Sequence, residues 1–168
     1  IPTAIGECGL DRRIASQPGR QKEIFLRQLQ LARQQALPVI VHLVGHMQLA
    51  LELLRAANLQ AGFVMHSWSG SVEMAAAFVA AGGLISLSAS SLRHPEKLRR
   101  LFAAIPLQAL LLETDAPDMP LPGWPQLCNE PAALPAIGAR IAEITGVRVE
   151  KLSEILYINA LRVFVRNP

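Results

Sequence analysis

Residues 38–42 have the sequence Pro-Val-Ile-Val-His, and residues 62–66 have the sequence Gly-Phe-Val-Met-His. Both are short apolar runs that end on a histidine. Uninterrupted apolar runs of this length are typical of strands that are covered on both faces, as in a parallel sheet. Similar runs recur along the chain, so we predict five strands, at residues 3–7, 38–42, 62–66, 83–88 and 110–115.

Longer segments with apolar residues at helical spacing separate these strands. In residues 21–36, the positions that recur at intervals of three or four, and so share one helix face, are Phe25, Leu29, Ala32 and Ala36. Further helices are predicted at residues 47–57, at 71–81 with Ser71 as the N-cap, and from residue 95 onward. Residues 116–131 are rich in proline, which predicts a long surface loop. Helices at 131–145 and 149–165 close the chain.

The alternation of strand and helix, repeated about every 27 residues between residues 7 and 115, predicts an α/β fold with a parallel sheet. A closed (β/α)8 barrel takes about 250 residues, whereas this chain has 168. Two architectures fit a single domain of residues 1–168. One is an open, doubly wound sheet of five strands, and the other is the C-terminal five βα units of a (β/α)8 TIM barrel with closing helices. Because Ile1 opens directly on a strand, we expect the sequence to be cut from a longer one.

The composition predicts a packed, soluble protein. Hydrophobic residues make up 51% of the chain and charged residues 17%, which excludes a disordered chain. No apolar run approaches the roughly 18 residues of a membrane-spanning helix. Two cysteines are too few for a disulfide framework, and no secretion signal opens the sequence, so we expect a cytoplasmic protein. The net charge of +3 permits an anionic partner without requiring one.

The residues that can carry chemistry stand at the ends of four predicted strands: Glu7, His42, His66 and Asp115. Any one of them alone could be a structural residue. In a parallel α/β sheet, however, the carboxyl ends of the strands meet at one rim, where ligands bind. Two imidazoles and two carboxylates form a mixed nitrogen and oxygen set that suits Zn²⁺, Mn²⁺ or Mg²⁺. We therefore predict a metal or acid–base site at this rim.

Three nearby residues are expected to play lesser parts. His46 follows His42 by four residues, the spacing of a helical zinc-binding pair, but His42 ends a strand, so we expect His46 to lie in a loop or helix start and to be solvated. Cys8 is expected on the opposite face of its strand from Glu7. Trp68 either shields the mouth of the site or packs against a turn.

Five sequence motifs resemble, in order and spacing, the TatD-type metal-dependent deoxyribonuclease family within the amidohydrolase-like barrels. They are GECGLD at residues 6–11, LPVIVH at 37–42, FVMHSWSGS at 63–71, LLLETDAPDMP at 110–120 and CNEP at 128–131. The resemblance spans essentially the whole chain. It implies a (β/α)8 barrel, two divalent metal ions in each complete site, and DNA as the substrate.

The resemblance also implies a role for each matching residue. Glu7 would bridge the two metal ions, and His42 and His66 would complete the second metal site. Asp115 would serve the first metal and orient or deprotonate the attacking water, so Asp115 and Glu7 are the expected catalytic pair. The residues that match the family's loop motif near the substrate mouth, and that are expected to bind substrate, are Asn129 and Glu130.

Two departures from the family pattern stand out. The family's first strand ends in a His-x-His pair that holds the first metal, and no His-x-His occurs in this sequence. Half of the binuclear site is therefore expected to be absent from this chain. Val44 stands where relatives tend to have an arginine, two residues after His42. Arg12 and Arg13 are expected to contact the substrate phosphate in its place.

Three functions are compatible with these residues. The first is a nuclease that removes nucleotides from DNA ends with Mg²⁺ or Mn²⁺, and the second is a hydrolase of an ester, amide or lactone that uses the same metal ligands. The third is a truncated, non-catalytic relative. Five strands of a barrel leave open edges at residues 3–7 and 110–115, and exposed edges pair readily with other chains. We therefore expect self-association, poor solubility or a longer parent polypeptide, and no membrane partner.

Overall fold

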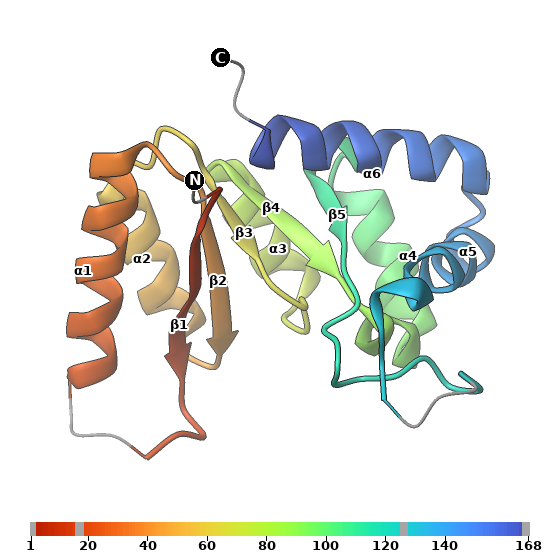
Figure 1. The fold of residues 1–168 in the computed structure, drawn as a ribbon, viewed down its shortest axis with the longest axis horizontal. Helices are drawn as coiled ribbons and strands as arrows, with labels where there is room; N and C mark the ends of the chain where they lie inside the picture. The colour runs from red at the N-terminus through yellow and green to blue at the C-terminus, as the bar shows by residue number, and fades with distance from the viewer. Residues whose placement is uncertain (1–2, 16–18, 125–127, 166–168) are drawn as a thin grey trace.

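The computed structural model describes residues 3–15, 19–124 and 128–165. Within these residues lies a sheet of five parallel strands in the order β1-β2-β3-β4-β5 (Figure 1). The strands are β1 (Ile5–Asp11), β2 (Val39–Val44), β3 (Phe63–Met65), β4 (Gly83–Leu87) and β5 (Leu110–Leu112). Strand order therefore follows chain order across the sheet.

Helices connect the strands, as the apolar spacing predicts. They are α1 (Arg20–Gln35), α2 (Met47–Ala57), α3 (Val72–Ala80), α4 (Pro95–Ala104), α5 (Leu134–Thr145) and α6 (Val149–Phe164), with short 3-10 turns at η1 (Ala89–Arg93), η2 (Leu107–Ala109) and η3 (Pro131–Ala133). The hydroxyl of Ser71 caps α3 by accepting a hydrogen bond from the amide of Met74 at 3.2 Å. None of the helices in the described ranges is long and apolar enough to cross a membrane.

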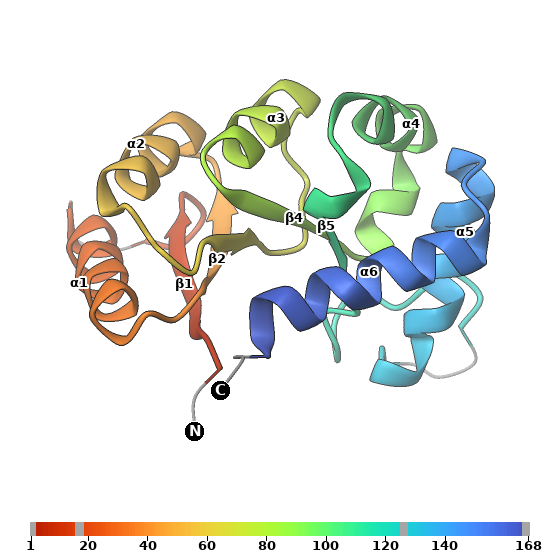
Figure 2. The same cartoon turned by 90° about the horizontal axis from the view of Figure 1, so that it is seen from above.

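The order of the strands distinguishes the two predicted architectures. A doubly wound sheet reverses its strand order at a switch point, whereas here every crossover leads to the next strand in the same direction. Figure 2 shows α1 to α4 arranged along one side of the sheet. Right-handed crossovers that all run in one direction place their helices on one face, as in a (β/α)8 barrel. The sheet is therefore built as five successive units of a barrel.

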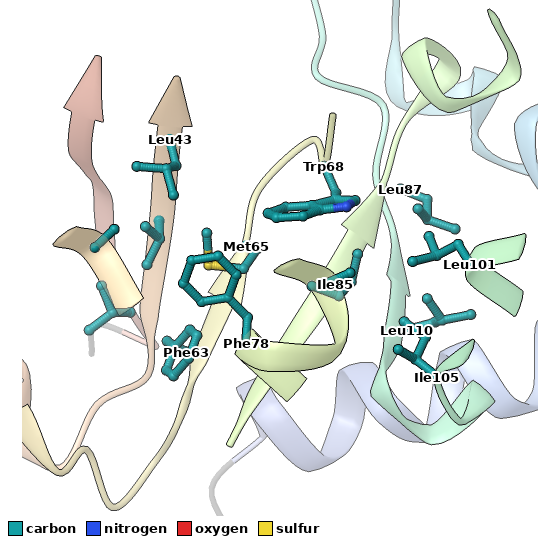
Figure 3. Packing of buried hydrophobic residues seen from close by; sticks show 14 of the residues in the cluster. Leu43, Phe63, Met65, Trp68, Phe78, Ile85, Leu87, Leu101, Ile105 and Leu110 are labelled. Carbon is teal, nitrogen blue, oxygen red and sulfur yellow. The ribbon is translucent and has the colours of Figure 1, made fainter. Parts of the chain in front are cut away.

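The main core lies between these helices and one face of the sheet, which we call the outer face. The strand residues buried there include Val39, Val41, Phe63, Met65, Ile85, Leu87 and Leu110. Figure 3 shows Phe78 of α3 packed against this face. Its ring meets Phe63 and Trp68 edge to face, with ring centroids 6.2 Å and 5.7 Å apart. Trp68 therefore packs into the core and does not shield the site.

The opposite, inner face of the sheet borders a cavity of about 440 Å³, to which the strands contribute Ile40, Val64, Ser86, Leu111 and Leu112. Helix α6 forms another wall of this cavity. Asn159 anchors α6 to the start of β5, because its side-chain amide donates hydrogen bonds to the carbonyls of Leu107 and Leu110, each at 2.8 Å. In a closed barrel this face is the interior and is filled by side chains from every strand.

Strand boundaries differ from the predicted ones. β1 continues past Glu7 to Asp11, and β2 continues past His42 to Val44, because residues 8–11 pair with residues 41–44. β5 ends at Leu112, short of Asp115, whose left-handed φ of 65° is incompatible with a strand. The predicted helix at 131–145 begins as the 3-10 turn η3 before α5. The proline-rich segment has no helix or strand in its described residues 116–124 and 128–130.

Candidate metal centre

Polar side chains gather on the inner face at the carboxyl end of the sheet. Side chains two residues apart on a strand point to the same face. Ile40 and Val64 line the inner cavity, so His42 and His66 extend from the same face further along. His42 lies within β2, and His66 directly follows β3. The two imidazole rings lie side by side, with centroids 6.2 Å apart.

Glu7 reaches the two histidines from the neighbouring strand β1. The pairing register of β1 with β2 shifts between Ile5 and Cys8, and irregularities of this kind re-aim a side chain. Glu7 Oε1 lies 2.8 Å from His42 Nδ1 and 3.5 Å from His66 Nε2. One potential ligand atom from each of these three residues lies within 4.8 Å of the others. Such a separation leaves a space between them that fits one cation.

Asp115 approaches the same space from the loop after β5, the edge strand opposite β1. Its Oδ1 lies 3.2 Å from His66 Nε2, and its left-handed backbone occurs three residues after the end of β5. Burial raises the pKa of Asp115 above its ordinary value, although the nearby His66 opposes that shift. Asp115, Glu113 and His66 form a second group of potential ligands within 4.8 Å of one another. All four residues predicted from the strand ends thus meet at one end of the sheet.

Glu113 belongs to this cluster although the strand-end pattern missed it. Its Oε1 lies 2.8 Å from His66 Nδ1 and accepts a hydrogen bond from the amide of Ser67, also at 2.8 Å. Its Oε2 accepts a hydrogen bond from the hydroxyl of Ser86 at 2.5 Å. The bond to Glu113 raises the pKa of His66 to about 9, against an opposing effect of burial. Strand alternation from Leu111 is the signal that points to Glu113, because the two share the inner face.

Asp11, the last residue of β1, is the second member that the sequence patterns missed. Its Oδ2 lies 3.0 Å from His42 Nε2, and its side chain is buried. Hydrogen bonds from Arg13 hold the pKa of Asp11 well below its usual range. Each histidine therefore has one ring nitrogen against a carboxylate and the other directed at Glu7. Carboxylates orient metal-binding imidazoles in this way.

The two arginines expected to bind substrate lie just past β1. Arg12 has an exposed side chain. Arg13 is also exposed, but its guanidinium pairs with Asp11, with Nη2 and Oδ2 2.7 Å apart. Contact of either arginine with a phosphate stays a prediction.

The loop residues expected to bind substrate are next to Asp115. Asn129 is buried, and its side-chain amide donates hydrogen bonds to the backbone carbonyls of Thr114, Asp118 and Met119. Asn129 therefore braces the loop on both sides of Asp115. Glu130 is half-buried beside it. Direct contact of Asn129 or Glu130 with substrate stays a prediction.

Two further residues lie away from the cluster. Cys8 is buried in the core on the other side of β1 from the site, and burial raises its pKa to about 11. His46 is exposed directly before α2. Among the described residues, neither belongs to a group that could hold a metal ion.

The motifs and the geometry agree with a comparison against known families. A family model described as TatD related DNase matches residues 2–165. The chain belongs to this family. The 3'-5' ssDNA/RNA exonuclease TatD of Erwinia billingiae (strain Eb661) is 38% identical over 170 residues, which cover 96% of this TatD-family chain and 65% of the relative. The human deoxyribonuclease TATDN3 is 34% identical over 166 residues, covering 96% of this chain and 59% of the relative.

Solved structures confirm the barrel fold of this TatD-family chain. YjjV, a TatD homologue from Escherichia coli K12, superposes with a TM-score of 0.88 at 33% sequence identity, over 98% of this chain and 64% of that one. The hydrolase of the TatD family from Entamoeba histolytica superposes with a TM-score of 0.85 at 20% identity, which shows the fold alone. The chain spans less than two thirds of the length of each of these relatives.

Proposed function

We propose that this chain carries the metal-binding part of a hydrolase that cleaves phosphodiester bonds of DNA. One observation supports this above all: Glu7, His42 and His66 direct one potential ligand atom each at a space that fits a cation. The space lies at the carboxyl end of a barrel sheet, where the active sites of (β/α)8 enzymes are found. The relatives named as an exonuclease and a deoxyribonuclease favour nucleic acid as the substrate.

The chemistry of the donor set fits a divalent cation. Imidazole nitrogens and carboxylate oxygens suit Zn²⁺ or Mn²⁺, and the carboxylates also suit Mg²⁺. In our proposal Glu7, His42 and His66 hold one ion, while Glu7 and Asp115 contribute to a second. Bound there, a divalent cation supplies positive charge that acidifies water and stabilises the charge developing on the phosphodiester.

The other roles in the proposed reaction fall to side chains of this chain. Asp115 accepts a proton from the attacking water, and the raised pKa of its half-buried carboxylate makes it a better proton acceptor. Glu7 sets the spacing between the two halves of the site. Arg12 and Arg13 are proposed to face the substrate phosphate, and Asn129 and Glu130 to form the wall of the substrate mouth. The free thiols of Cys8 and Cys128 fit the reducing cytoplasm, where we propose that the protein acts.

The substitution Asp115→Asn tests the role of the proton acceptor. We expect release of nucleotides from single-stranded DNA in Mg²⁺ or Mn²⁺ to fall at least about 100-fold, the usual contribution of general base catalysis. The circular dichroism spectrum and ion uptake at Glu7, His42 and His66 are expected to be unchanged. Asp118→Asn makes the same chemical change at an exposed position in the same loop and is the matched control.

Near-normal turnover by Asp115→Asn would refute the assignment of the base. If the unsubstituted protein is inert toward DNA but hydrolyses a small ester, amide or lactone, the substrate class is wrong while the metal centre stands. If it binds no divalent ion, the proposal of a metal-dependent hydrolase fails as a whole.

A further inference from the structure

The ion pair between Arg13 and Asp11 is built differently from the other ion pairs near the site. Arg13 Nη2 lies 2.7 Å from Asp11 Oδ2, and Arg13 Nε lies 3.1 Å and 3.2 Å from the two carboxylate oxygens. The backbone amide of Arg13 donates a further hydrogen bond to Oδ1 at 2.8 Å. Asp11 is 5% exposed, and Arg13 is 67% exposed. The arginine thus clamps a buried carboxylate from the solvent side, in the fork geometry that fixes a carboxylate's orientation.

The clamped carboxylate faces His42. Asp11 Oδ2 lies 3.0 Å from His42 Nε2, while His42 Nδ1 lies 2.8 Å from Glu7 Oε1. Asp11 and Glu7 can both only accept a hydrogen bond, so a neutral His42 ring donates to one of them at a time. Asp11 is the buried acceptor that Arg13 holds in place, and when it accepts the Nε2 proton the lone pair of Nδ1 faces Glu7. In that tautomer Nδ1 and Glu7 Oε1 are two facing acceptors, which repel each other unless a proton or a metal ion lies between them. Asp11 therefore prepares His42 to share a cation with Glu7.

We propose that Arg13, acting through Asp11, is a positioning residue that holds His42 in the orientation that binds a divalent ion. This inference rests on the proposed function, because it assumes that Glu7, His42 and His66 bind that ion. This positioning of His42 is a role separate from any contact between Arg13 and substrate. Two of its side-chain nitrogens bond to Asp11 and fix the orientation of that carboxylate. The same carboxylate then contacts His42.

The two histidines differ in how their carboxylates are supported. Glu113, which faces His66, is held by the hydroxyl of Ser86 and the amide of Ser67, both neutral donors. Asp11, which faces His42, is held by a cationic side chain that water can reach. Removing the charge of Arg13 should therefore loosen His42 and leave His66 in place. Because Arg13 is largely exposed, its substitution should also leave the fold intact.

Zinc affinity of the intact protein, measured by competition with a chromophoric chelator, provides the test. Loss of a carboxylate that hydrogen-bonds a metal-binding imidazole typically weakens metal binding about 10- to 100-fold, and we expect a loss in that range for Asp11→Asn. Arg13→Gln should weaken binding by roughly 3- to 10-fold, since it acts one residue further away. Arg13→Lys, which keeps the charge but not the fork, should fall between Arg13→Gln and the unsubstituted protein.

Two comparisons make the result specific. Arg27→Gln breaks an exposed pair with Glu23 on α1 and should leave zinc affinity unchanged. In the Asp11→Asn background, adding Arg13→Gln should cause no further loss of zinc affinity, because both substitutions break the same chain of contacts from Arg13 through Asp11 to His42. If Asp11→Asn fails to fold, the zinc affinities of the proteins with arginine, lysine and glutamine at position 13 still test the proposal.

Unchanged zinc affinity in Arg13→Gln, or a full additional loss in the double variant, would overturn the inference. Failure of the unsubstituted protein to bind zinc contradicts the proposed function instead. The two failures are therefore distinguishable.

Discussion

At the scale of single residues, the site is a set of carboxylates arranged around two imidazoles. Glu7 lies between the rings, Asp11 and Glu113 lie behind them, and Asp115 flanks one of them. A dense group of acids around His66 has an electrostatic consequence. In the absence of a metal ion the imidazole is stabilised in its protonated form, with a pKa raised to about 9, chiefly by Glu113.

This raised pKa predicts how the stability of the metal-free protein depends on pH. The folded state binds a proton at His66 that the unfolded state, with an ordinary pKa of about 6.5, releases. The resulting stabilisation is complete below pH 6.5 and is lost as the pH rises to about 9. We expect the free energy of unfolding in urea to fall across that window, with a slope of at most about 1.4 kcal/mol per pH unit.

Glu113→Gln should flatten this slope, because it removes the carboxylate that contributes most to the shift. The pKa of His66 itself, followed by NMR, should move back toward its ordinary value. Glu143→Gln, an exposed acid on α5, is a control that should leave the slope unchanged. A steep slope that persists in Glu113→Gln would show that another group causes it.

At the scale of secondary structure elements, the close contact of β1 with β2 positions Glu7 and Asp11 against His42. Gly9 lies between these two acids and pairs with His42. A Cβ atom at Gly9 would lie 1.9 Å from the carbonyl oxygen of His42. The two strands therefore pair in this register only because residue 9 has no side chain.

Gly9→Ala is expected to destabilise the protein by about 3 kcal/mol or more, since backbone atoms of two paired strands must separate. Metal binding should weaken as well, because Glu7 and Asp11 move with β1. Gly146→Ala, at the C-cap of α5, has a left-handed φ of 73° but meets no atom within 4 Å, so it should cost only about 1 kcal/mol. Urea denaturation of both variants checks this, and equal losses would contradict the clash at Gly9.

At the scale of the whole molecule, the described residues form a three-residue set around Glu7 and a second set, with Asp115 and Glu113, that shares His66 with the first. His66 offers only Nε2 to an ion, because Nδ1 faces Glu113. We therefore predict that this chain takes up one divalent ion, measured by equilibrium dialysis and elemental analysis. His42→Ala should reduce that uptake to near zero. Two tightly bound ions per chain would show that Asp115 and its neighbours form a site of their own.

The sheet also has free edges. Within the described residues, β1 pairs only with β2 and β5 only with β4, and the inner face opens on a cavity of about 440 Å³. Unpaired strand edges beside an apolar face favour association with another chain. We propose that this 168-residue chain self-associates, with sedimentation coefficients that rise with concentration. A monomer at all concentrations tested would contradict this expectation.

Much of this architecture follows from local sequence patterns. A parallel α/β sheet follows from the apolar runs before His42 and His66 and from the apolar residues at helical spacing between these runs. Such periodicity depends only on neighbouring residues. The motifs around Glu7 and Asp115 identify the TatD family, which the family model confirms. The convergence of strand ends in a parallel sheet is equally a matter of topology, so a cluster of these residues was predictable.

Only the tertiary structure decided which side chains support that cluster. Asp11 and Glu113 lie 31 and 47 residues along the chain from the histidines they contact. Strand alternation places Glu113 on the inner face, but no local pattern shows which histidine either acid contacts. The length of β1, the burial of Asn129 and the clamp of Arg13 on Asp11 likewise depend on contacts across strands and loops. The sequence by itself determined a parallel α/β sheet and the imidazoles and carboxylates at its strand ends, whereas long-range packing set the strand order and the orientation of each imidazole.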